Sequence, residues 1–393
     1  MKEAFSRRGL RLTLALLAIG VLVIAISASG GSARAAVTSH SDCAKVVGGS
    51  AGNGRCSGVI GAIPVDAQCV GLSDAAGGLP PLIWHGGPVM GTTTAGITVT
   101  PIFWNPAGHP MTDSYKSIIT KYLSDVAAAS GSNDNVYSTM NEYTGSTGRA
   151  NYKMIVGPAI DDTSALPADG CFLTHKDLTG IYSDGSGYDA CLDDAQISNE
   201  ADRVAKNNGM PADLAHIYVV FLPKHVETCF LPGSTNTVRK GNQLCTINHE
   251  KSAGYCAYHT MASNGMVYAN LSFPIYSSPV GFTCGTDARI AFRAIQSPNG
   301  DPDADTELSP TSHEIMEAIT DPDVSTGWYD AAGFENGDEC AYVYGQPIGG
   351  SAGTFYNQTI NGGHYLTQEE FSNQDFSITK KGCVQGADQE ATP

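Results

Sequence analysis

Cysteine is the residue type that most restricts the fold of this chain, because eleven cysteines lie between residues 43 and 383. In an oxidising compartment this number predicts a framework of four or five disulfide bridges, with one cysteine unpaired or bonded elsewhere. No Cys-x-x-Cys pair occurs, which argues against a structural zinc knuckle or a thioredoxin-like site. Sequence does not fix connectivity, but the pairings favoured by short separation are Cys171–Cys191, Cys340–Cys383, and Cys43 with Cys56 or Cys69.

The first 35 residues have the properties of an export signal. Basic residues precede an apolar run over residues 12–26, and small residues then lead to an Ala-Arg-Ala cleavage pattern at 33–35. The run is shorter than the roughly 20 residues that cross a bilayer, so cleavage after Ala35 is favoured over an uncleaved anchor. We therefore expect a secreted, extracellular protein with no membrane contact after signal cleavage.

Composition excludes several classes of protein. Of the 393 residues, 42% are hydrophobic and 16% are charged, which predicts a globular core and excludes a disordered tail or a coiled coil. The chain carries 22 Lys and Arg against 39 Asp and Glu, a formal charge of −17. Because this charge repels phosphate backbones, nucleic acid is excluded as a partner. Oligomeric state is not encoded in any pattern of the chain.

The hydrophobic pattern predicts one α/β (or α+β) domain over residues 80–383, after the signal peptide (1–35) and a Cys- and Gly-rich extension (36–79), and before a tail (384–393). β-Branched runs predict strands at 96–104, 152–160, 216–223 and 266–276. Helical periodicity predicts helices at 114–129, 195–208, 287–294 and 309–320. This order indicates a mixed sheet, followed by a loop-rich C-terminal part held by disulfides.

The main chemical motif is His-Glu-x-x-Glu in the helix expected at 309–320. His313 and Glu317 are four residues apart, which places both on one helix face, as required to hold one zinc ion. Glu314 occupies the position of the general base in a zincin helix, where it would polarise a water molecule for hydrolysis. The usual second ligand is His, and a Glu at 317 lowers the Lewis acidity of the ion. The alternative is that His313 simply pairs with a carboxylate in an acidic helix.

A third ligand is expected from the carboxylates that follow the helix. Glu335 and Asp338 are the favoured candidates, because the chain can turn back through residues 328–329 to bring either one to the helix. The remaining carboxylates in this segment are Asp321, Asp323 and Glu339. Zinc or a similar divalent ion is the predicted cofactor. Calcium is the alternative, since residues 299–307 carry alternating acids, although they lack the Gly and Glu of a regular calcium loop.

Three weaker motifs have simpler explanations. Residues 183–187 resemble part of a serine-hydrolase elbow but lack its first glycine, so we expect a turn. Cys256 and His259 could form a Cys/His pair, but the thiol is expected to be oxidised in a cystine-rich protein. His85 and His364 follow turn sequences, and we expect structural roles for both.

Several segments occur in an order that resembles the EXORDIUM-like, or phosphate-induced, secreted proteins and their bacterial relatives. The resemblance covers roughly residues 80–383 and leaves out 36–79. The segments that carry it are 83–90, 102–104, 219–224, 255–259, 312–322, 333–340, 356–365 and 368–370. It implies an extracellular or cell-wall-associated protein with no settled enzymatic activity. Plant relatives often carry Asn at the position of Asp321, which makes Asp321 the less persuasive ligand.

Two functions follow from these observations. The first is a secreted metal-binding protein that acts as a zinc-dependent, peptidase-type hydrolase, with metal ligands His313, Glu317 and Glu335 or Asp338, and with Glu314 as base. The second is a non-catalytic extracellular or cell-wall-associated binding protein that keeps the scaffold, with or without a structural metal. A peptide or a cell-wall component is the expected partner in either case. A coordination position of the metal that no protein ligand fills would indicate the hydrolase. A site closed by a fourth protein ligand would indicate the binding protein.

Overall fold

The computed structural model describes residues 56–60, 63–67, 80–171, 181–182, 184–230, 244–248, 252–253, 255–275, 284, 294–324 and 326–386. By internal packing the chain divides into residues 1–35 and 36–393, and every described residue belongs to the second unit. Among these residues, no helix has the length and apolar character needed to cross a membrane.

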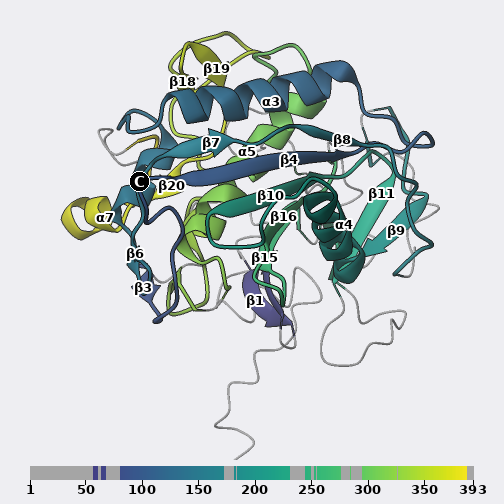
Figure 1. Cartoon of the computed structure of the whole chain (residues 1–393). Helices are drawn as coiled ribbons and strands as arrows, with labels where there is room; N and C mark the ends of the chain where they lie inside the picture. The colour runs from purple at the N-terminus through teal and green to yellow at the C-terminus, as the bar shows by residue number, and fades with distance from the viewer. Residues whose placement is uncertain are drawn as a thin grey trace, which may run out of the picture. The chain divides into compact units, whose positions relative to one another are not determined.

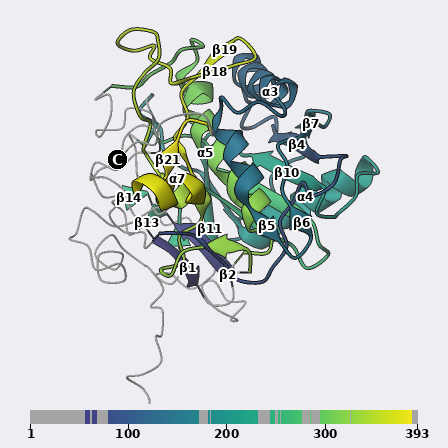
Figure 2. The same ribbon diagram turned by 90° about the vertical axis from the view of Figure 1, so that its left-hand side faces the viewer.

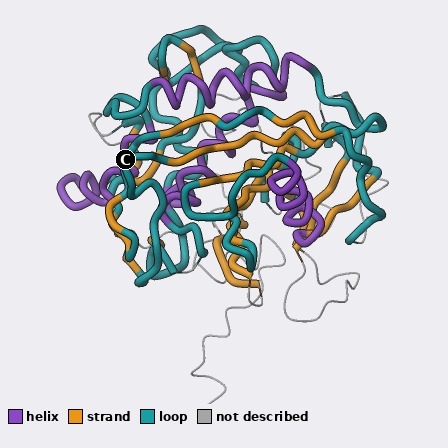
Figure 3. Tube along the Cα trace, in the orientation of Figure 1, coloured by secondary structure: helices purple, strands orange, loops and turns teal. Residues whose placement is uncertain are grey.

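A six-stranded mixed sheet lies at the centre of the molecule (Figure 3). Its order is β15 (Ala257–Met261), β16 (Val267–Leu271), β10 (His216–Phe221), β4 (Ile97–Trp104) and β7 (Met154–Val156), and β8 (Ile160–Asp162) also pairs with β4. All of these pairs are parallel except β15 with β16. The apolar run of β10 is buried on both faces, as is typical of a central parallel strand.

Helices cover both faces of this sheet (Figures 1 and 2). Helices α3 (Asp113–Ala128) and α5 (Pro302–Thr320) share one hydrophobic cluster with Val219 and Phe221 of β10. Helix α4 (Asp194–Asn207) shares a second cluster with Tyr218 and Val220 of the same strand. Because strand side chains alternate between faces, one strand serves both clusters. The prediction of a mixed α/β domain is confirmed.

Helix α5 begins earlier than the sequence indicates. Asp301 is its N-cap, accepting hydrogen bonds from the backbone N–H of Asp303 and Ala304, and Pro302 fills the first helical position. Pro310, near the start of the helix expected at 309–320, lies well inside the observed helix. Most of residues 299–307, the segment named as an alternative calcium site, is thus the start of this helix and not an extended loop.

Helix α5 is also buried on every side. From Ala304 to Thr320 all its residues are buried except Pro310, so the helix lies in the interior of the domain. An interior helix is normally apolar all round. This one carries five buried titratable side chains, which are Asp305, Glu307, His313, Glu314 and Glu317.

The other predicted elements differ mainly in length. The strand expected at 152–160 is interrupted, forming β7 and β8, and the strand expected at 266–276 ends at Leu271. The helix expected at 287–294 falls almost entirely outside the described residues. The remaining elements are η1 (Val136–Glu142), β1 (Cys56–Ile60), β2 (Ile63–Ala67), β3 (Ile83–Trp84), β5 (Thr144–Gly145), β6 (Gly148–Arg149), β9 (Ala190–Asp193), β11 (Val226–Phe230), β12 (Leu244–Cys245), β13 (Ile247–Asn248), β14 (Ser252–Ala253), β17 (Trp328–Tyr329), α6 (Asn336–Glu339), β18 (Gln358–Ile360), β19 (Gly363–Tyr365), β20 (Glu370–Phe371), α7 (Asn373–Thr379) and β21 (Cys383–Val384).

Four disulfides connect the described cysteines. Cys171–Cys191 and Cys340–Cys383 are the two pairs favoured by their short separation, and both predictions are confirmed. The other two bridges are Cys229–Cys245 and Cys256–Cys284. The expected bridge of Cys43 with Cys56 or Cys69 lies outside the side chains that the structure describes.

Candidate metal centre

Helix α5 directs three titratable side chains into one buried space. His313 and Glu317 lie one turn apart, and the His313 Nε2 atom is 3.1 Å from Glu317 Oε1. The same nitrogen is 4.0 Å from Glu314 Oε1. Each of the three residues has an exposed fraction of 1% or less. The His-Glu-x-x-Glu spacing therefore brings together the residues that the sequence places on one face.

Two neighbours fix the orientation of the His313 ring. The Gln368 Nε2 atom lies 2.9 Å from His313 Nδ1 and also donates to the carbonyl oxygen of Gly337 at 2.7 Å. A Cβ atom on Gly337 would lie 2.7 Å from two atoms of the ring. Only glycine at 337 lets the backbone of α6 approach the ring this closely. Because the Gln368 amide nitrogen donates to Nδ1, the proton of the neutral ring is on Nε2, which faces Glu317 Oε1. A metal ion that binds at Nε2 has to displace this proton.

Helix α6 brings the carboxylate of Asp338 to the same place. The backbone N–H of Asp338 donates to Glu317 Oε1 at 2.9 Å, and the Asp338 side chain is fully buried. This bond joins α6 directly to α5, although the two residues are 21 positions apart. Of the two favoured third ligands, Asp338 is therefore the one beside the His313 ring.

His259, in the middle of edge strand β15, completes the cluster. Its Nδ1 atom lies 3.3 Å from Glu314 Oε2 and 3.7 Å from Glu317 Oε2. Its Nε2 atom lies 3.1 Å from the backbone carbonyl oxygen of Asp321, which can only accept. The hydrogen-bond network therefore assigns the proton to Nε2 and leaves the lone pair of Nδ1 facing two carboxylates. That arrangement is typical of a metal ligand held by a backbone carbonyl.

From the sequence, His259 was considered only as half of a Cys/His pair and not as a metal ligand, because a single histidine in a short strand is not informative by itself. A signal was nevertheless present. Alternation along β15 places His259 on the same face as Ala257, which packs with α5, whereas Tyr258 packs with α4. The alternating pattern of this strand, considered together with the His-Glu-x-x-Glu motif of the helix, would have placed His259 next to that motif.

The residues form two groups with the geometry of a metal site. The His259 group consists of His259, Glu314 and Glu317, and the His313 group consists of His313, Glu317 and Asp338. Within each group the ligand atoms all lie within 4.8 Å of one another. Histidine nitrogen and carboxylate oxygen are ligands for zinc and similar divalent ions. The buried residues therefore fit a metal ion, but they do not by themselves identify it.

The other candidate ligands occupy the edge of the cluster. Glu335 Oε1 lies 3.8 Å from His259 Nε2, so this carboxylate is beside the His259 ring. Asp321 uses its Oδ1 atom to accept from the backbone N–H of Thr326 and Gly327, and so stabilises the turn after α5. Asp323 and Glu339 belong to neither group.

Burial makes this cluster unfavourable without a cation. It raises the pKa of Glu314 to about 8, and it also raises the pKa of Glu317. Glu370 of β20 is fully buried, and its pKa is raised well above the usual range by the same loss of solvent. No described lysine or arginine pairs with these three carboxylates. A divalent ion would supply the missing positive charge.

One oxygen atom gives direct support for this interpretation. Glu317 Oε2 is buried and has no hydrogen-bond partner among the described residues. Its nearest recorded polar neighbour is His259 Nδ1, at 3.7 Å, whose lone pair faces it. A buried carboxylate oxygen that lacks a donor costs free energy, so a ligand at this point would stabilise the fold.

The other motifs do not contribute to the centre. Four cysteines lie close together, with Cys191 Sγ 3.6 Å from Cys229 Sγ, but both are in disulfides and offer no thiolate. Cys256 is bonded to Cys284, which excludes the Cys/His pair. His85 stacks on Tyr329, and His364 stacks on Tyr356. Ser183 lies outside the described residues.

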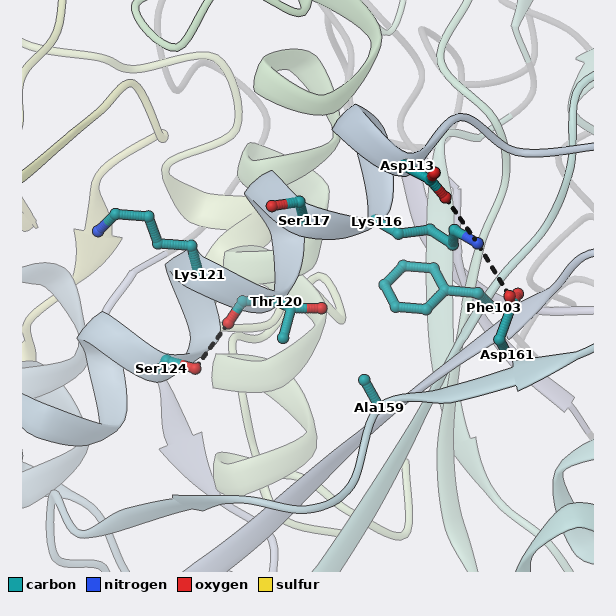
Figure 4. A pocket seen from close by; sticks show the side chains of 9 residues that line it. All are labelled: Phe103, Asp113, Lys116, Ser117, Thr120, Lys121, Ser124, Ala159 and Asp161. Carbon is teal, nitrogen blue, oxygen red and sulfur yellow. Dashed lines mark hydrogen bonds and ion pairs between the residues drawn. The ribbon is translucent and has the colours of Figure 1, made fainter.

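A separate groove lies along helix α3, away from the centre (Figure 4). Lys116 crosses it, with Nζ 2.9 Å from Asp161 and 3.5 Å from Asp113. Hydroxyl groups of α3 line the opposite part of the groove. Its charges are already paired with each other, so it presents no reactive group.

In comparison with known proteins, no protein-family model matches the chain, and neither the curated proteins nor the solved structures include a match.

Proposed function

We propose that this chain is a secreted metal-binding protein whose divalent ion, zinc in the first instance, is enclosed in the interior of the domain. The observation that carries the proposal is the position of Glu317, whose two oxygens face ring nitrogens of His313 and His259. The enclosed centre favours the non-catalytic extracellular function, because His259, His313, Glu314, Glu317 and Asp338 expose 2% or less of their surface. The resemblance to EXORDIUM-like proteins supports the same choice.

Elemental analysis of the mature protein tests this proposal. We expect divalent metal to co-purify in the absence of chelators, and we expect chelation to lower the melting temperature, because ion binding stabilises only the folded state. Zinc should restore the original temperature. A protein that contains no metal, and whose melting temperature does not respond to chelator or zinc, would contradict it.

A metal-dependent hydrolase is the second candidate, and the position of Glu314 favours it. This carboxylate lies within 3.3 Å of the His259 ring and 4.0 Å of the His313 ring. A bound divalent ion would polarise a substrate carbonyl, and Glu314 could then accept a proton. A peptide is the substrate class we would expect, and the scaffold would then be zincin-like.

The Glu314→Gln variant separates the two functions. For a hydrolase, this change should keep the fold and reduce activity by about 10²- to 10⁴-fold, the usual contribution of a general base. Activity is measured by incubating the metal-loaded wild type and variant with a peptide library and detecting cleavage. If neither protein cleaves any peptide, the enclosed binding protein is supported. The matched control is Glu307→Gln, since Glu307 is equally buried on α5 but belongs to neither metal group.

A further inference from the structure

The two metal groups share one residue. Glu317 belongs to both, whereas His259 and His313 belong to different groups among the described residues. The two oxygens of the Glu317 carboxylate correspondingly face different histidines. Its Oε1 atom faces His313 Nε2 and accepts from the backbone of Asp338, while its Oε2 atom faces His259 Nδ1. Each oxygen thus has its own histidine.

This arrangement is difficult to explain with a single ion. Zinc binds nitrogen and oxygen at about 2.0–2.2 Å, so one ion can use both histidines only if their free nitrogens converge on it. Here the carboxylate of Glu317 has a different oxygen toward each ring. Each side also has a second carboxylate of its own, Glu314 for the His259 group and Asp338 for the His313 group.

The charge of the cluster leads to the same conclusion. Glu314, Glu317, Asp338 and Glu370 each expose 1% or less of their surface. Both oxygens of Glu370 lack a hydrogen-bond partner among the described residues, as does Glu317 Oε2. Coordination requires the three ligand carboxylates, Glu314, Glu317 and Asp338, to lose their protons, and together they then carry one negative charge more than a single divalent ion compensates. With Glu370 ionised as well, two divalent ions balance the four carboxylates.

We propose that the centre binds two divalent ions, with Glu317 as the bridging carboxylate. One ion is held by His259 and Glu314, and the other by His313 and Asp338. Two-metal sites in proteins place their ions about 3.5–4 Å apart, a separation that one carboxylate can bridge. This inference rests on the proposed metal-binding function and adds the number of ions and the role of each ligand.

Metal stoichiometry tests the proposal. The full-length mature protein is stripped with chelator and titrated with Zn²⁺ by calorimetry, and the bound metal is counted by elemental analysis. We expect two ions per chain in the wild type. His259→Ala and His313→Ala should each retain one ion, and Glu317→Ala should lose the second ion and weaken the first. Glu307→Gln should bind two ions, as the wild type does.

A spectroscopic measurement on the wild type makes the test independent of whether the variants fold. Protein loaded with Mn²⁺ should give the electron paramagnetic resonance spectrum of an exchange-coupled pair, because a bridging carboxylate couples the two ions. The spectrum of isolated ions at full loading would overturn the proposal. One ion per wild-type chain would overturn it as well but leave the proposed function intact, whereas no bound ion would contradict both.

Discussion

The His313 ring is held by a contact that tolerates no additional atom. Because a Cβ atom at position 337 would lie 2.7 Å from the ring, Gly337→Ala must displace either the ring or helix α6. We expect a loss of about 1–3 kcal/mol of unfolding free energy, the usual effect of overpacking, together with weaker zinc binding. Chemical denaturation and zinc titration measure the two effects.

The matched control for this substitution is Gly108→Ala. A Cβ atom at position 108 would meet no atom within 4 Å, so this variant should bind zinc like the wild type. If Gly337→Ala behaves in the same way as the control, the ring of His313 is not positioned by α6.

Outside the centre, Glu200 of helix α4 introduces a dependence of stability on pH. Its carboxylate and that of Asp162 both pair with Arg203, and burial followed by the nearby Asp162 raises the pKa of Glu200 to about 7. The folded protein therefore retains a proton that the unfolded chain releases near pH 4.5. Stability contributed by this proton is present below pH 4.5 and is lost as pH rises toward 7.

Denaturation at pH 5 and pH 8 tests this expectation. The unfolding free energy of the wild type should fall between these values relative to that of Glu200→Gln, which cannot ionise. The opposite slope, or parallel curves for the two proteins, would show that Arg203 keeps Glu200 ionised in the folded state.

At the scale of elements, helix α5 decides the position of the whole centre, and its start is set by Asp301. Removing this N-cap side chain leaves the first N–H groups of the helix without their acceptor. Asp301→Ala should therefore cost about 1 kcal/mol of unfolding free energy, with a range of about 0.5–2. Denaturation measures it, and Asp301→Asn, which preserves the cap, should lie close to the wild type. Equal losses in the two variants would mean that charge, and not capping, is responsible.

Helix α5 also shows which features of the centre could be predicted from the sequence and which could not. The i, i+4 spacing correctly placed His313 and Glu317 together, because that relation is local and depends only on helical geometry. The start of the helix was predicted too late, because a proline such as Pro310 is unfavourable inside a helix and the tertiary packing that offsets its cost is not visible in the sequence. His259 was missed for a related reason. Its approach to Glu314 depends on the pairing of β15 with β16, a long-range contact.

For the whole molecule, two of the cystines differ in their relation to the candidate metal centre. Cys340 follows helix α6 directly and is bonded to Cys383 of β21. Removing this bridge with serine at both positions should cost about 2–5 kcal/mol and also weaken zinc binding, since Asp338 lies two residues before Cys340. Thermal melting and zinc titration are the measurements.

The bridge Cys171–Cys191 is the control at this scale. It joins β9, which pairs with β11 beside helix α4, and neither strand carries a residue of the His259 group or the His313 group. Its removal should lower the melting temperature without changing zinc affinity. A loss of affinity in both variants would show that any destabilisation of the domain disturbs the centre.

The spread of the ligands along the chain has a consequence for when the ion is acquired. The residues of the two metal groups extend from His259 to Asp338, and the Gln368 contact and the Cys383 bridge come later still. No short stretch of an emerging polypeptide contains the site, so loading has to wait until the domain has closed around it. Affinity for divalent metals follows a general order that a protein can alter only in part. Under the proposed function, the concentrations of free metals in the compartment where folding ends would therefore decide which ion is bound.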